Sequence, residues 1–129
     1  MAIRVVQLGS PRRSDEGLRV GTVRRPPRGV PTSQYAARNF FDVWLPEIAP
    51  TADLIDDVRE GGGSEAAWRR FERRYRAQLK RPQHAHLVEF LAALSHGTNF
   101  SIGCYCADEE RCHRSILRDV LRERGARLA

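Results

Sequence analysis

The stretch Asn99–Leu121, NFSIGCYCADEERCHRSILRDVL, decides the fold and holds the most distinctive chemistry of the chain. Its first part, Thr98–Cys106, is largely apolar and predicts a buried strand. From Cys112 onward, apolar residues recur at helical spacing and predict an amphipathic helix. A strand, a short loop and a helix start form the junction at which open α/β sheets bind ligands. We therefore expect the functional site in this stretch.

All three cysteines of the chain lie in this stretch, at Cys104, Cys106 and Cys112. An odd number of clustered cysteines argues against a complete disulfide framework and favours a reducing compartment. The first ten residues carry a single charged side chain and only a short apolar run, so we expect no secretory signal, and no run is long enough to span a membrane. We expect a cytoplasmic protein.

Three chemical interpretations of the junction remain open. The first is anion binding, because the free N–H groups of a helix start, the charge of Arg114 and the hydroxyl of Ser115 suit a phosphate or carboxylate. The second is a reactive thiol, because a helix start and neighbouring basic residues lower the pKa of a cysteine, here Cys112. The third is a Cys₃His metal site, although the gap from Cys104 to Cys106 is tighter than usual for zinc.

We assign these residues to candidate roles while the three interpretations stay open. Cys112 and His113 are the candidate catalytic residues. The candidate ligand-binding residues at the junction are Arg114, Ser115, Cys104 and Cys106. No residue is assigned as a metal ligand, and no cofactor is predicted. A phosphatase-type loop requires an arginine six positions after its cysteine. No arginine stands there after Cys104 or Cys106, so we do not predict such a loop at either residue.

The rest of the chain alternates predicted strands with predicted helices. Strands are expected over 3–8 and 18–23, and helices over 51–60, 64–81 and 84–95. The aromatic segment Gln34–Pro46 is expected to pack in the core rather than to stack on bases. Nothing repeats and no second core is indicated. The pattern predicts a single three-layer α/β domain, residues 1–129, with a small and mostly parallel sheet.

The formal net charge of +6 favours an anionic partner such as a nucleotide or nucleic acid. Positive charge is concentrated in residues 1–30 and 64–81, each with seven basic residues against two acidic ones. Three arginines, Arg24, Arg25 and Arg28, lie on a turn interrupted by three prolines and complete the candidate ligand-binding set. Guanidinium groups on a stiff turn match the geometry of phosphate, and a solvated loop is the open alternative.

The junction resembles the YeaO-like proteins of Domain of Unknown Function 488 (DUF488). One branch of that family is similar in having a late strand that ends in cysteine, a glutamate two residues on, and Cys-His-Arg at the start of the last helix. Here the pattern is Cys104, then Cys106 in place of the glutamate, then Cys112-His113-Arg114. The substitution at Cys106 replaces a general acid or base by a third thiol, which weakens acid–base chemistry and favours a metal or redox role.

The middle of the chain resembles the other branch of the family, and the resemblance covers most of residues 18–121. The shared motifs are Pro27-Arg28-Gly29, Trp44-Leu45, Ala49-Pro50 and the helix pattern Trp68, Phe71, Tyr75. The resemblance implies a compact, cytoplasmic, Rossmann-like α/β domain. We expect a phosphate-bearing ligand, a nucleotide or nucleic acid, to bind at the Cys-His-Arg helix start and to be processed there. A thiol or Cys/His metal protein and a non-enzymatic interaction module are the alternatives.

Overall fold

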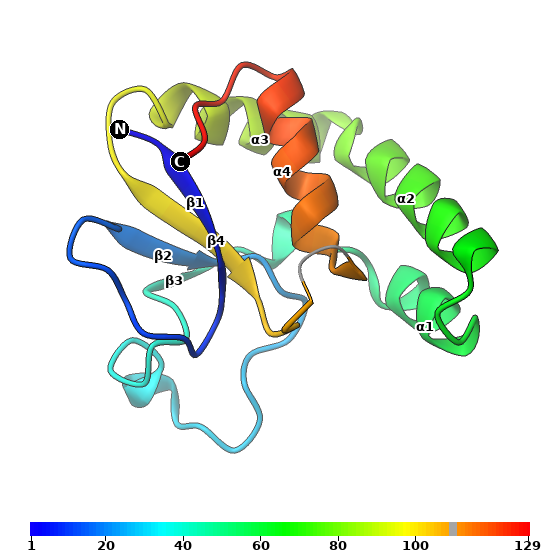
Figure 1. Ribbon diagram of the computed structural model, residues 1–129, viewed down its shortest axis with the longest axis horizontal. Helices are drawn as coiled ribbons and strands as arrows, with labels where there is room; N and C mark the ends of the chain where they lie inside the picture. The colour runs from blue at the N-terminus through cyan, green and yellow to red at the C-terminus, as the bar shows by residue number, and fades with distance from the viewer. Residues whose placement is uncertain (109–110) are drawn as a thin grey trace.

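The computed structural model describes residues 1–108 and 111–129 (Figure 1). Its elements, in chain order, are β1 (Ile3–Gln7), β2 (Leu18–Gly21), η1 (Thr32–Gln34), β3 (Val43–Trp44), η2 (Pro46–Ile48), α1 (Ala52–Glu60), α2 (Glu65–Leu79), α3 (Pro82–Leu94), β4 (Phe100–Cys104) and α4 (His113–Glu123). The α/β class is confirmed. No helix in the described part of the chain is long and apolar enough to cross a membrane.

The sheet has the strand order β1-β4-β2-β3, and the pairs it forms are all parallel. The last strand in the sequence, β4, is therefore central, with Phe100 beside both Ile3 and Leu18. Because the strands are parallel, their carboxyl ends meet at one edge, where Cys104 ends β4 beside Gln7 of β1. This edge positions the predicted site.

The main core lies between one face of the sheet and the four helices, which Figure 1 shows gathered to one side of the strands. Ile3, Val20 and Ile102 supply the strand side of this core. On α2 the stripe predicted from helical periodicity is confirmed, since Phe71 and Tyr75 are buried. Ser64 caps this helix by accepting a hydrogen bond from the amide of Ala67 at 3.2 Å.

Loops lie over the other face of the sheet, and a buried ion pair holds them there. Glu16 and Arg19 are 2% and 0% exposed, and Arg19 Nε donates to a Glu16 carboxylate oxygen at 2.7 Å. Arg19 Nη1 also donates to the carbonyls of Ser10 and Asn39, and the Ser101 hydroxyl donates to Glu16 at 2.8 Å. The pair joins β2, β4 and both covering loops in one network.

Several elements differ in extent from those expected. The two-residue strand β3 falls inside the aromatic segment and is too short to leave a periodic signal. Helix α3 begins at Pro82 rather than His84, because proline is well suited to the first turn of a helix. Strand β4 ends at Cys104, so Cys106 lies beyond the strand instead of sharing a strand face with Cys104.

Candidate functional site

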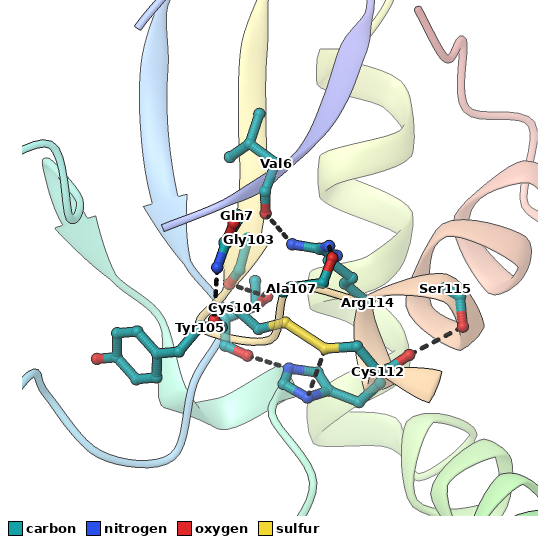
Figure 2. The surroundings of a disulfide bond; sticks show 11 residues. Val6, Gln7, Gly103, Cys104, Tyr105, Ala107, Cys112, Arg114 and Ser115 are labelled. Atoms are coloured by element: carbon teal, nitrogen blue, oxygen red, sulfur yellow. Dashed lines mark hydrogen bonds between the residues drawn. A yellow bond between two sulfur atoms is a disulfide. The ribbon is translucent and has the colours of Figure 1, made fainter. Parts of the chain in front are cut away.

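A disulfide joins Cys104 at the end of β4 to Cys112, the residue that precedes α4 (Figure 2). Both cysteines are buried, whereas Cys106 is exposed and has a free thiol. The Sγ atoms of all three lie within 4.8 Å of one another. The three cysteines that are clustered in the sequence therefore also lie together in the structure. Cys112, a candidate catalytic residue, has no free thiol in this form.

His113 opens α4 with its ring turned toward β2. Nε2 lies 2.6 Å from the carbonyl oxygen of Thr22. A carbonyl only accepts, so Nε2 carries the ring proton and Nδ1 has a free lone pair, 3.9 Å from Cys112 Sγ. Burial, with a smaller contribution from the nearby charge of Arg114, lowers the pKa of His113 to about 4, and the Thr22 hydrogen bond only partly opposes this shift. The imidazole is therefore neutral near pH 7.

Arg114 and Ser115, both predicted to bind ligand, make structural contacts. The Arg114 side chain is buried and donates from Nη1 to the carbonyl of Val6 at 2.8 Å, as Figure 2 shows. Its Nη2 donates to the carbonyl of Ala107 at 3.4 Å. The Ser115 hydroxyl donates to the carbonyl of Cys112 at 2.8 Å. These bonds hold the end of β1 and the start of α4 around the cysteines, and neither residue lines the pocket described next.

A pocket of about 380 Å³ opens over the cysteine junction. It brings together six of the predicted site residues, namely Arg24, Arg25, Arg28, Cys104, Cys106 and His113. Helix α1 forms the opposite wall and adds Asp56 and Arg59. Four arginines and one carboxylate thus surround one cavity, which we call the arginine pocket. The chain places the proline-interrupted turn over the cysteines, although 75 residues or more separate them in the sequence.

The arginines of the pocket are held differently. Arg24 donates from Nε to the carbonyl of Pro50 at 3.1 Å and from Nη2 to that of Ala49 at 2.8 Å. Arg59 is 3.9 Å from a carboxylate oxygen of Asp56. The side chains of Arg25 and Arg28 make neither a hydrogen bond nor an ion pair with any residue that the structure describes. These two guanidinium groups are available to a ligand.

Sequence reasoning missed the contributions of α1 and of Tyr105. Ala52, Asp56 and Arg59 stand at helical spacing, so one face of α1 lines the pocket. Because α1 belongs to a net acidic segment, its sequence gives no signal of an anion site. Sequence reasoning also missed that Arg118 stands six positions after Cys112, the spacing of a phosphatase-type loop. Residues 113–118 are helical in the structure, so they form no such loop.

In the other positive segment, residues 64–81, three of the seven basic residues pair with acids of α1 and α4. Arg70 donates to Asp57 at 2.8 Å, and Arg76 donates to Glu123 at 3.0 Å. Arg74 donates to Asp53 at 3.2 Å. Part of the charge that appears unopposed along the sequence is therefore balanced across α1, α2 and α4. The arginine pocket is the stronger candidate for an anion, because its arginines surround a cavity.

A comparison with family models matches residues 3–125 to the model described as the active DUF488-N3 subclade (DUF488-N3a). Neither the search of curated proteins nor the search of solved structures gives a match. The match covers nearly the whole chain, including the cysteine junction and both walls of the arginine pocket. This protein therefore belongs to the DUF488 family, in its active N3 subclade.

Proposed function

We propose that this protein binds a phosphate-bearing ligand, a nucleotide or a nucleic acid, in the arginine pocket. The observation that carries the proposal is the pair Arg25 and Arg28, whose side chains have no partner among the described residues although they line the same cavity. With Arg24 and Arg59 they set four positive charges against the single carboxylate of Asp56. Such a cavity attracts anions and excludes cations.

The chemistry of guanidinium favours phosphate over other anions of similar charge. Arginine presents planar donor groups that match two phosphate oxygens at once, and its charge does not depend on pH. A volume of about 380 Å³ is at the lower end of the range for small-molecule sites and suits a single nucleotide unit. We therefore propose that a free nucleotide, or one nucleotide of a single strand, enters the pocket.

The residues able to act on the bound ligand lie at the base of the pocket. Cys106 supplies an exposed thiol, and His113 supplies a neutral imidazole whose Nε2 is engaged by Thr22. The family description, an active subclade, supports a site that carries out chemistry, and it names no reaction. Processing of the ligand by Cys106 or His113 is the second part of the proposal.

Binding to a labelled single-stranded oligonucleotide and to nucleoside monophosphates tests the proposal. In the double variant Arg25→Ala/Arg28→Ala we expect at least about tenfold weaker binding, because each charge-assisted hydrogen bond contributes about 1.5–3 kcal/mol. For the oligonucleotide, the slope of log K against log salt should also fall by about 1.4.

The matched control is Arg69→Ala/Arg73→Ala, which removes two exposed arginines from α2, outside the pocket. It should keep wild-type affinity. Equal affinity of the pocket variant and the wild type would disprove the proposal. Loss of binding in the α2 variant alone would assign the interaction to that helix and support the interaction-module alternative.

A further inference from the structure

We propose that the reduced protein binds a zinc ion through the thiolates of Cys104, Cys106 and Cys112. Their three Sγ atoms lie within 4.8 Å of one another. Tetrahedral zinc–sulfur bonds of about 2.3 Å place neighbouring sulfurs roughly 3.8 Å apart. The side chains therefore need only small movements, once the disulfide is reduced, to surround one ion. This inference stands on the cysteines and does not depend on the proposed phosphate ligand.

Cys104 and Cys106 are closer in sequence than is usual for two zinc ligands, but the path of the backbone allows both to bind one ion. Strand β4 ends at Cys104, and the chain leaves the sheet before Cys106. The Cα atoms of Cys104 and Cys112 are 7.6 Å apart, wider than the roughly 4.4–6.8 Å usual for a disulfide. That separation leaves room for an ion between two reduced sulfurs.

His113 is the candidate for the fourth ligand, although its ring must move closer to the other two cysteines, because only the three sulfurs lie within 4.8 Å of one another. Its Nδ1 lies 3.9 Å from Cys112 Sγ and has a free lone pair, because Nε2 donates to the carbonyl of Thr22. Histidines that bind metals commonly donate their other ring N–H to a backbone carbonyl, which fixes the tautomer and the ring plane. Thr22, the residue that follows β2, supplies this second contact.

The surroundings give the ion both a protected side and an entry path. Cys104 and Cys112 are 1% and 2% exposed and belong to a cluster with the apolar residues Leu8, Val23 and Phe41. Cys106 is exposed to solvent and lines the arginine pocket. A soft thiolate set in such a half-enclosed position selects zinc over magnesium or calcium, which require oxygen ligands.

Zinc binding and the disulfide exclude each other, because a disulfide sulfur is no thiolate. In the zinc form, a peroxide such as hydrogen peroxide can oxidise the Cys104–Cys112 pair. Each of the two thiolates gives up one electron, one S–S bond forms, and the peroxide takes both electrons and two protons to become two water molecules. Zinc keeps its oxidation state and leaves, because Cys106 and His113 alone provide two ligands.

Metal analysis of the purified full chain tests the site. Protein reduced under nitrogen and incubated with zinc should retain one zinc ion per chain after desalting, and the disulfide form should retain none. Hydrogen peroxide should release that zinc to a chromogenic chelator as thiols disappear. A reduced protein that retains no zinc, or one that retains one ion per two chains in a dimer, would overturn the proposal.

Single substitutions locate the ligands. Cys106→Ser keeps the Cys104–Cys112 pair and should still form the disulfide, yet lose stoichiometric zinc. Because Cys106 is exposed, we expect this variant to fold, and circular dichroism checks that it does. His113→Ala should weaken zinc at least about tenfold, whereas His86→Ala, which changes an exposed histidine on α3, should not. Unchanged zinc affinity in Cys106→Ser would refute the three-thiolate site.

Discussion

The hydroxyl of Tyr105 donates a 2.9 Å hydrogen bond to the carbonyl oxygen of Arg25. Tyr105 stands between Cys104 and Cys106, so this bond ties the turn that carries the arginines to the cysteine junction. Burial raises the pKa of Tyr105 to about 12, with a smaller contribution from Tyr35, so the hydroxyl keeps its proton and remains a donor near pH 7. The two halves of the candidate site are joined by one side chain.

We predict that Tyr105→Phe weakens the phosphate-bearing ligand about fivefold, because a typical hydrogen bond contributes about 1 kcal/mol. The melting temperature should change little, since the tyrosine is partly exposed. Isothermal titration of the variant beside Tyr35→Phe, whose ring packs edge-to-face on Phe41, measures the effect. A larger loss of ligand affinity in Tyr35→Phe than in Tyr105→Phe would contradict the role given to the Tyr105–Arg25 hydrogen bond.

Arg19→Met should lower the free energy of unfolding by about 3–5 kcal/mol, because it leaves the carboxylate of Glu16 buried without its partner. Urea denaturation measures the change. Arg13→Met is the matched control, since Arg13 forms an exposed pair with Asp15 at 3.7 Å, and such pairs contribute about 0–1 kcal/mol. Similar losses of unfolding free energy in both variants would show that the buried pair stabilises the protein no more than the exposed pair.

The stability of the protein should fall in acid partly through Glu16. Burial raises the pKa of this carboxyl, but hydrogen bonds from Arg19 and Ser101 outweigh burial, so its pKa is lowered from 4.5. A lowered folded-state pKa contributes stability that is present above the unfolded value and lost as pH falls through the folded value. Glu16→Gln should be less stable at pH 7 and lose less between pH 5 and pH 3. An identical acid slope in variant and wild type would contradict this.

Gly103→Ala should destabilise the protein by about 1–3 kcal/mol, the usual cost of overpacking. A Cβ at this position would lie 2.7 Å from the carbonyl oxygen of Val6 and 2.8 Å from Leu8 Cδ2. The Val6 carbonyl also accepts from Arg114, so the change reaches the site. Gly97→Ala serves as the control, because its nearest contact is 3.8 Å away. Thermal denaturation of the two variants should separate them, and equal melting temperatures would contradict the close approach.

Local patterns predicted the junction well, because the periodicity of a strand or a helix depends on residues that are close in sequence. Sequence alone placed Cys104 at a strand, Cys112 at the start of a helix and the arginine turn in an irregular segment, and the structure agrees to within one residue. The expected parallel sheet is confirmed as well. Such features depend on interactions between residues close in sequence, and not on which elements pack against each other.

Features set by tertiary contacts could not be predicted. Arg19 and Glu16 are charged residues of a kind seldom buried, yet they pair with each other in the interior. Arg59 enters the site only because α1 packs beside the arginine turn. Arg114 was assigned to a ligand from its place in the sequence, whereas its guanidinium reaches back to Val6. Whether the pocket takes phosphate stays a prediction.

The central position of β4 has a consequence for biosynthesis. Strand β1 pairs with β4 and has no ladder with β2, so the two N-terminal strands remain apart until residues 100–104 are available. The ribosome must therefore release most of the chain before the sheet can close, and folding begins with long loops whose closure slows it. During translation, Cys104 is synthesised after both strands that flank it in the sheet and before Cys112, its disulfide partner. The cysteine junction therefore forms only after the central strand of the sheet is available.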